Sequence, residues 1–176
     1  MTDGGDTQMG ELGRILTALV EAGVDFVVCG GIACVMHGIS RVTNDLDICV
    51  RMDEQNLGRL VEAVQRFGLQ PRIPEPIEAL LDPQKRREWV EKKNAKVFTL
   101  VSLNTVLQID VMLEYPVAYT ELAREATVLR AGDLTFRISS KEHLIAAKQQ
   151  VQPPRKTDLR DIEDLRELIE RERSSS

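Results

Sequence analysis

The segment TNDLDICV, residues 43–50, constrains the fold more than any other part of the chain. Its aliphatic residues alternate with polar or small ones, which is typical of a β-strand with one buried face. Side chains two positions apart point to the same face of a strand, so Asp45 and Asp47 project together, roughly 7 Å apart along the backbone. Two carboxylates beside a partly buried core raise each other's pKa and lower stability. A divalent cation would remove that conflict, and carboxylate oxygens on one rigid strand suit Mg²⁺.

A third carboxylate, Asp110, lies in the strand-like segment VLQIDVML, residues 106–113. This is the most apolar context of any acid in the chain. If the two strands pair side by side, three carboxylates share one site, which can hold two metal ions and support in-line displacement at phosphorus. An Asp-x-Asp pair alone is more often a cap or a solvated strand end. An acid within an apolar strand is rarer, because buried acids need a partner, so the three together favour a metal site.

Two glycines, Gly30 and Gly31, follow an apolar strand at residues 26–29 and precede a short helix. Such a turn lets backbone N–H groups approach an anion, helped by the helix dipole, although a simple tight turn would need the same residues. Arg41, just before the Asp45 strand, could reach a phosphate or pair with a nearby acid.

Strands and helices are predicted in mixed order rather than in strict alternation. Helical spacing and stop signals predict helices near residues 12–22, 32–37, 54–67, 83–93, 119–124, 139–150 and 157–170. Period-two and continuous apolar runs predict strands near residues 26–29, 45–50, 96–102, 105–115, 126–130 and 134–138. We therefore expect one α/β or α+β domain over residues 10–171, with helices packed on a mixed sheet. Residues 1–9 and 172–176 are predicted to be disordered.

Charge and composition exclude several classes of protein. The formal net charge of −5 disfavours a protein that coats long DNA, since such proteins carry a basic surface. No apolar run reaches the length of a membrane span, and the acidic, Gly-rich start differs from a targeting peptide, so we expect a cytoplasmic protein without a membrane partner. Three cysteines without a close pair are expected to be buried, reduced thiols.

The segment VVCGGIACVMHGISRVTNDLDICV, residues 27–50, resembles the nucleotidyltransferase superfamily that includes DNA polymerase β. That family pattern is a strand, Gly-Gly or Gly-Ser, a helix, Asp-x-Asp on the next strand, and a third acid on a later strand. Residues 143–165, HLIAAKQQVQPPRKTDLRDIEDL, are similar to the C-terminal signature of the small bacterial members called AbiEii-like toxins or minimal nucleotidyltransferases. The resemblance extends over residues 24–170 and implies a nucleotidyltransferase-like mixed sheet with C-terminal helices.

The resemblance implies a role for each matching residue. Asp45 and Asp47 would bind both Mg²⁺ or Mn²⁺ ions, and Asp110 would complete the metal site and act as, or orient, the general base. An NTP is the implied substrate. Its phosphates would be contacted by Gly30, Gly31 and Lys148. Lys156 and Asp158 would either contact the phosphates or form a structural ion pair.

The chain departs from the wider superfamily in two respects. Gly31 stands where the widespread Gly-Ser turn has a serine, so one hydroxyl contact to phosphate is missing, although the AbiEii-like branch often has Gly-Gly. The extra domains with which polymerases and tRNA-end-adding enzymes hold a template or long acceptor are also missing. Processive polymerisation is therefore not expected.

These features predict an enzyme that moves an NMP from an NTP to a hydroxyl acceptor on tRNA, on a protein or on a small molecule. An antitoxin or toxin partner is implied by family analogy alone. The alternative functions are a catalytically inactive nucleotide-binding or partner-binding module and a metal-dependent phosphohydrolase. The basic segment at residues 85–96, which contains Trp89, is either a contact face for tRNA or an acidic protein, or a solvated helix with Trp89 docked on the core.

Overall fold

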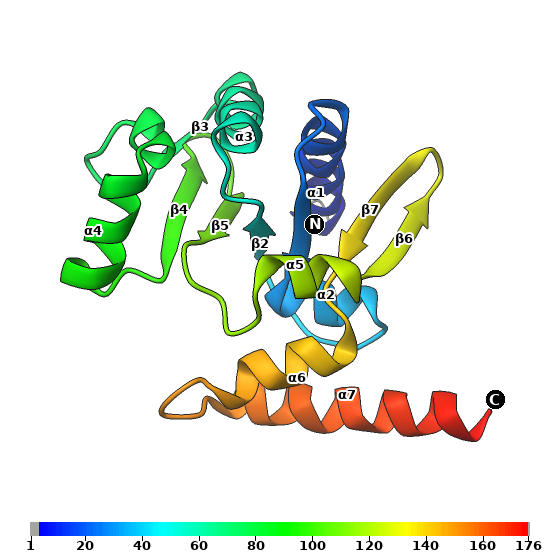
Figure 1. Ribbon diagram of the computed structural model, residues 1–176. Helices are drawn as coiled ribbons and strands as arrows, with labels where there is room; N and C mark the ends of the chain where they lie inside the picture. The colour runs from blue at the N-terminus through cyan, green and yellow to red at the C-terminus, as the bar shows by residue number, and fades with distance from the viewer. Residues whose placement is uncertain (1–3, 176) are drawn as a thin grey trace.

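The strand that carries Asp45 and Asp47, β2 (Asp45–Val50), is the central strand of a seven-stranded sheet. The computed structural model describes residues 4–175, with side chains from residue 10 onward (Figure 1). The other strands are β1 (Phe26–Cys29), β3 (Leu69–Pro71), β4 (Val97–Ser102), β5 (Gln108–Met112), β6 (Thr127–Ala131) and β7 (Leu134–Ile138). The helices are α1 (Gly4–Glu21), α2 (Gly30–Met36), α3 (Glu54–Arg66), the 3₁₀ helix η1 (Ile77–Leu81), α4 (Pro83–Lys93), α5 (Tyr119–Arg124), α6 (Lys141–Gln149) and α7 (Lys156–Ser174). The strand order is β3-β4-β5-β2-β1-β7-β6, a mixed α/β architecture that confirms the predicted fold class.

The pairing of β2 with its neighbours sets the position of the acids. β2 is antiparallel to β1 and parallel to β5. In the β2–β5 ladder, Asp47 lies opposite Asp110, and Asp45 lies opposite Gln108. Residues directly opposite one another point to the same face of a sheet. The three aspartates therefore share one face, as the sequence pattern predicted.

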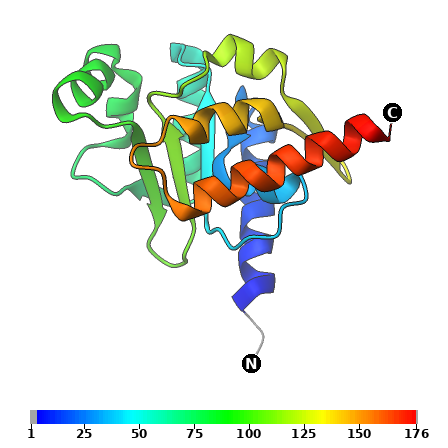
Figure 2. The same cartoon turned by 90° about the horizontal axis from the view of Figure 1, so that it is seen from below.

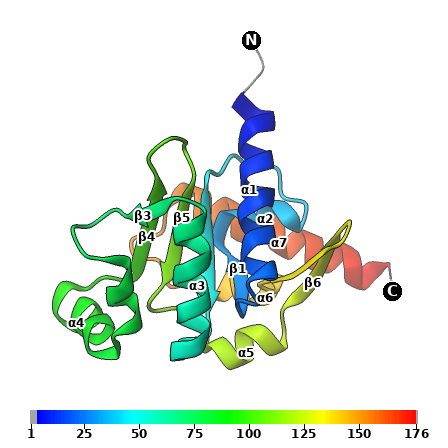
Figure 3. The ribbon, with the colours of Figure 1, turned by 90° about the horizontal axis from the view of Figure 1, so that it is seen from above.

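The two faces of the sheet are covered differently. α1 and α3 lie side by side over one face, where they pack on residues such as Val28 and Ile48 in the main core (Figure 3). The aspartate-bearing face carries a smaller cluster that includes Cys29, Cys49 and Leu122 of α5. α6 and α7 run next to each other across the end of the sheet where β1 ends and β2 begins (Figures 1 and 2). This arrangement leaves the aspartates between the sheet and the C-terminal helices.

Both terminal helices are longer than the sequence pattern indicated. α1 begins at Gly4 and α7 ends at Ser174, so each helix enters a segment that was expected to be disordered. Residues 1–3 and 176 lie outside the described part of the chain. The division into one domain with disordered ends stays a prediction.

The segment that contains Pro71, Pro74 and Pro76, for which the sequence pattern predicts no helix or strand, contains two short regular elements, β3 and η1. β3 is an edge strand that pairs only with β4. An edge strand tolerates proline because its outer side makes no ladder hydrogen bonds, which accounts for Pro71. Pro76 stands just before η1, where a missing N–H leaves no helical hydrogen bond unmade.

The basic helix α4 docks on the sheet through Trp89. Its side chain is buried and stacks on Phe98 of β4, with 5.0 Å between ring centroids. The lysines at the end of the helix are exposed. The docking of Trp89 on the core is confirmed, and a contact role for the basic segment stays a prediction.

Two further expectations concern the chain as a whole. All three cysteines are buried and free. Within residues 4–175, no helix combines the length and apolar character needed to cross a lipid bilayer.

Candidate active site

Gly30 lies directly against Asp47, where β1 passes into α2. Its φ of +60° is in the left-handed region that favours glycine. A Cβ atom at this position would lie 1.9 Å from Asp47 Oδ2, far inside van der Waals contact. Backbone conformation and space therefore both require glycine at residue 30. The turn approaches the carboxylate more closely than any other residue type would allow.

The environment of Asp47 raises the pKa of its carboxyl group. Its side chain is partly buried, and burial raises its pKa to about 6, with the negative charges of Asp110 and Asp45 adding to the rise. The Gly31 N–H donates a hydrogen bond to the carboxylate and opposes the rise. At neutral pH the fold thus holds an ionised carboxylate at an electrostatic cost that a nearby cation relieves.

Asp110 is held in place from its own strand and from β4. Thr99 Oγ1 donates a hydrogen bond of 2.6 Å to Asp110 Oδ1. Gln108 Nε2 lies 3.2 Å and 3.1 Å from the two carboxylate oxygens. Asp45 is exposed at the start of β2. Asp45 is therefore open to solvent, whereas Asp47 and Asp110 on the same face of the sheet are partly buried.

The donor set of Asp45, Asp47 and Asp110 fits a hard divalent cation. All three donors are carboxylates, which Mg²⁺ and Mn²⁺ prefer, and their mutual repulsion contributes to the raised pKa of Asp47. The oxygens of the three do not all lie within 4.8 Å of one another in this structure. The register of β2 and β5 brings the three acids to neighbouring positions. The Asp110 carboxylate is hydrogen-bonded to a protein group, Thr99.

A tighter group of metal-ligating atoms, which the sequence did not indicate, lies near the contact of α5 with α6. His143 Nε2 is 3.7 Å from Glu121 and 3.4 Å from Glu125, and one ligand atom from each of the three residues falls within 4.8 Å of the others. Arg124 already pairs with Glu125 at 2.8 Å, and His143 Nδ1 is buried without a hydrogen-bond partner among the described residues. A metal-bound histidine normally donates its second N–H to an acceptor. This group therefore lacks the support that the ligands of a metal site usually have.

A network of ion pairs joins the loop before β2 to α6 and α7. Buried Lys148 Nζ is 2.7 Å from Asp161 Oδ2 and 3.2 Å from Asp158 Oδ1. Arg41 pairs with the same Asp161, and Arg155 Nε lies 2.6 Å from Asp158 Oδ2. Burial alone raises the pKa of Asp158, but the hydrogen bond from Arg155 and the charge of Lys148 outweigh it, and the pKa is lowered. The two aspartates therefore hold three cations at fixed positions.

A cavity of about 920 Å³ opens on the aspartate-bearing face. Gly30, Asp47, Lys148 and Asp158 line it, together with the mostly apolar segment of residues 112–119. The lining thus combines acids and cations with apolar surface. Such a lining suits a ligand with a charged part and a flat or apolar part.

Several predicted residues do not line this cavity, namely Gly31, Arg41, Asp45, Asp110 and Lys156. Lys156 is exposed at the first position of α7, whereas Arg155, one residue earlier, lines the cavity and pairs with Asp158. Sequence reasoning missed Arg155 and Asp161. Both lie three residues from Asp158, and residues three apart share one face of a helix, so the spacing contained the signal.

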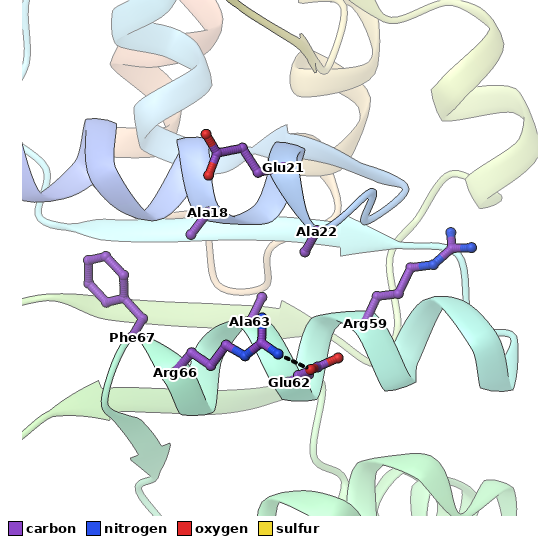
Figure 4. Close-up of a pocket in the computed structure, with 8 residues that line it drawn as sticks. All are labelled: Ala18, Glu21, Ala22, Arg59, Glu62, Ala63, Arg66 and Phe67. Atoms are coloured by element: carbon purple, nitrogen blue, oxygen red, sulfur yellow. Dashed lines mark hydrogen bonds and ion pairs between the residues drawn. The ribbon is translucent and has the colours of Figure 1, made fainter.

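A second hollow, of about 350 Å³, lies on the opposite side of the molecule between α1 and α3 (Figure 4). Three of its charged residues already have protein partners, since Arg66 pairs with Glu62 and Arg59 donates to the Gly23 carbonyl. No residue of the predicted site lines it. The cavity beside the aspartates is therefore the candidate active site.

The fold is similar to that of solved antibiotic adenylyltransferase and resistance-factor structures. The lincomycin-bound lincosamide antibiotic adenylyltransferase LnuA superposes with a TM-score of 0.60 and 16% identity, covering 90% of this chain and 96% of that chain. The solution structure of the antibiotic-resistance factor ANT(2″)-Ia has a TM-score of 0.54 and 16% identity, and the match covers 97% of this chain and 93% of that chain. The crystal structure of ANT(2″)-Ia in complex with adenylyl-2″-tobramycin has a TM-score of 0.52 and 15% identity, and the match covers 96% of this chain and 98% of that chain. At these identities the likeness establishes the fold.

The sequence itself matches a known family over almost its whole length. No curated protein sequence is similar enough to count as a match. A family profile described as nucleotidyl transferase AbiEii toxin, type IV toxin–antitoxin system, matches residues 14–176. The matched region contains the Gly-Gly turn, the three aspartates and the C-terminal ion pairs. The chain therefore belongs to the AbiEii nucleotidyltransferase toxin family.

Proposed function

We propose that the chain transfers a nucleoside monophosphate from an NTP to a hydroxyl acceptor and releases pyrophosphate, with Mg²⁺ or Mn²⁺ as cofactor. The observation that carries the proposal is the register of β2 and β5, which sets Asp47 opposite Asp110 and beside the Gly30 turn. Membership of a nucleotidyltransferase family supports the reaction class.

The three aspartates would hold the metal ions. When bound, the ions supply charge neutralisation at the phosphates and make the acceptor hydroxyl more acidic. Asp110, fixed by Thr99 and Gln108, would orient the acceptor hydroxyl or take up its proton. Both roles need the carboxylate in one rotamer, which its three hydrogen bonds provide.

The phosphates would bind at the Gly-Gly turn, beside the aspartates. Gly30 and Gly31 allow close approach of the triphosphate, and Lys148, Arg41 and Arg155 surround it with positive charge. Asp158 and Asp161 keep these cations in place before the nucleotide binds. Arg155 is better placed than Lys156 for the phosphate contact expected of the basic-x-Asp signature.

The size of the cavity is compatible with each of the candidate acceptors. A volume of about 920 Å³ is near the top of the range of roughly 300–1,000 Å³ found for small-molecule sites. It would hold a nucleotide together with a small acceptor or the protruding end of a large one. A tRNA end, a protein hydroxyl and a small molecule all meet this condition. The family description supports a toxin role with an antitoxin partner. The cytoplasmic location expected from the sequence stays a prediction.

The test is incubation of the purified protein with each α-labelled NTP, Mg²⁺ or Mn²⁺, and total cell RNA or protein. We expect label on one pool for the wild type and none for Asp45→Asn or Asp47→Asn. Asp133→Asn, which changes an exposed acid in the β6–β7 turn, is the matched control and should label normally. Retained labelling in both site variants would refute the proposal. Phosphate release without an adduct would indicate a phosphohydrolase instead.

A catalytically inactive partner-binding module is the second candidate. It is favoured by the ion-pair network, in which the cations of the cleft are already satisfied by protein carboxylates. Thermal unfolding separates the two functions, since a ligand that binds the native state raises the unfolding temperature. A pure partner-binding module would show no metal-dependent stabilisation by any NTP.

A further inference from the structure

The space beside Gly31 is filled by a threonine hydroxyl. A Cβ atom placed on Gly31 would lie 2.6 Å from Thr43 Oγ1 and 3.1 Å from Cζ of Arg41. The first distance is shorter than any contact a real Cβ makes, so residue 31 has no room for a side chain while Thr43 is present. The Thr43 hydroxyl therefore occupies the volume in which the side chain of a Gly-Ser turn would begin.

Space rather than backbone strain excludes a side chain at residue 31. Gly30 has a positive φ, whereas Gly31 is absent from the positive-φ residues of the described chain. An L-residue could therefore adopt the backbone conformation of residue 31. The two positions of the turn require glycine for different reasons. At residue 30 the backbone conformation and the side chain of Asp47 exclude a Cβ atom, and at residue 31 the side chain of Thr43 does.

We propose that the Thr43 hydroxyl donates the phosphate contact that the Gly-Gly turn itself lacks. The inference rests on the proposed function, because it assigns a nucleotide contact in the same site. In a Gly-Ser turn the hydroxyl comes from the turn, and here it comes from the loop that enters β2. The turn and the loop supply one hydroxyl between them.

The surroundings of Thr43 suit an anion. Thr43 is partly buried and lies two residues before Asp45, at the entrance to β2. Its hydroxyl has no hydrogen-bond partner among the described residues, so its proton is available. The Arg41 guanidinium borders the same space, held by Asp161. A hydroxyl donor next to a fixed guanidinium is a favourable position for a phosphate oxygen.

The first test compares Thr43→Val, which keeps the shape and removes the hydroxyl, with Thr43→Ser, which keeps the hydroxyl. Binding of non-hydrolysable α,β-methylene NTPs with Mg²⁺ is measured by titration calorimetry. A hydrogen bond to a charged group predicts about ten- to a hundred-fold weaker binding for Thr43→Val. The loss should be the same factor for every base that binds, because the contact is to phosphate. Thr43→Ser should stay within about threefold of the wild type.

The control is Thr127→Val, which makes the same change at a partly buried site on β6, away from the cleft. It should bind the analogues as the wild type does. If Thr43→Val binds them equally well while the wild type still transfers label, the hydroxyl assignment is wrong and the proposed function stands. A wild type that binds no NTP with either metal contradicts both.

A second test moves the hydroxyl from the loop to the turn. Gly31→Ser alone should weaken binding, because the new Cβ collides with Thr43 Oγ1. Adding Thr43→Ala removes the collision and leaves a hydroxyl in the same space. The double variant should therefore bind the analogues better than Thr43→Ala alone. A folded double variant that binds no better than Thr43→Ala would overturn the inference.

Discussion

Gly30 and Gly132 have nearly the same backbone conformation and very different surroundings. Their φ angles are +60° and +61°. A Cβ at Gly30 would strike Asp47, whereas a Cβ at Gly132 would meet nothing within 4 Å. Alanine at either position adopts the left-handed region at a cost of about 1–2 kcal/mol. Only at Gly30 does the substitution also displace a carboxylate of the site.

We therefore predict that Gly30→Ala destabilises the protein by more than Gly132→Ala, which should cost about 1 kcal/mol. Urea unfolding followed by the fluorescence of Trp89, the single tryptophan, measures both. Gly30→Ala should also abolish nucleotide binding, while Gly132→Ala leaves it intact. Equal losses for the two variants would show that the close approach to Asp47 has no energetic weight.

The raised pKa of Asp47 predicts a dependence of stability on pH. Its pKa is about 6 in the folded chain against 3.8 as the ordinary value, so the folded state binds this proton more tightly than the unfolded state. Between about pH 4 and pH 6 the contribution of Asp47 to stability therefore falls as pH rises, and above about pH 6 the full cost is present.

Asp47→Asn should remove that cost. In EDTA at about pH 8 the variant is expected to be more stable than the wild type by up to about 2–3 kcal/mol, from 1.36 kcal/mol for each pKa unit. The difference should vanish near pH 4, where the wild-type carboxyl is protonated. Thermal unfolding across this range measures it, with the exposed Asp45→Asn as the control expected to change little. A variant less stable than the wild type at high pH would contradict the assigned charge repulsion.

At the scale of elements, α7 contributes two buried carboxylates, Asp158 and Asp161, to the ion pairs beside the cleft. Asp161 accepts from Lys148 and Arg41, so Asp161→Asn removes one of the two carboxylates beside buried Lys148 and the carboxylate partner of Arg41. Losses on breaking a buried pair are typically about 3 kcal/mol or more. Asp164, on the same helix, faces Arg160 at 3.9 Å in an exposed pair, and Asp164→Asn should cost less than about 0.5 kcal/mol. Chemical unfolding measures the loss of stability in the two variants. Similar losses for Asp161→Asn and Asp164→Asn would contradict the prediction.

The sequence pattern was most informative where one strand or helix carries its own signal. The alternation in β2 and the apolar surroundings of Asp110 predicted two strands, and the acids on one face followed from the strand geometry. The pattern could not reveal β3, because three residues with a proline resemble a loop until the neighbouring β4 supplies hydrogen bonds. Edge strands of this kind are defined by their partner.

The positions of the acidic residues of the candidate site could be predicted from the sequence, whereas the partners of its basic residues could not. Arg41 was expected either to reach a phosphate or to pair with an acid, and the residue it pairs with, Asp161, lies 120 residues away in the chain. No local pattern contains such a contact. Arg155 was missed because the basic-x-Asp spacing drew attention to Lys156, although three-residue spacing is the one that brings side chains together at a helix start.

At the scale of the molecule, the cleft depends on the last helix. A chain that ends after Gln152 keeps the three aspartates and Lys148, but it loses both carboxylates that pair with Lys148 and the buried Leu165. We predict that this truncation lowers the unfolding temperature by about 10 °C or more and abolishes stabilisation by NTP.

A chain that ends after Glu170 is the matched control. It keeps Asp158, Asp161 and Leu165 and loses only exposed residues of α7. It should unfold within a few degrees of the full chain and respond to NTP in the same way. If NTP stabilised the chain that ends after Gln152, α7 would be dispensable for the cleft.

The order of the site along the chain also has a consequence for its synthesis on the ribosome. The Gly-Gly turn and Asp47 are translated early, Asp110 follows, and the carboxylates that fix Lys148, Arg41 and Arg155 come last. Domains fold as units once their elements have emerged. A nascent chain therefore carries its acids before it has a finished pocket, because Asp158 and Asp161 must also leave the ribosome before Lys148, Arg41 and Arg155 are held in place.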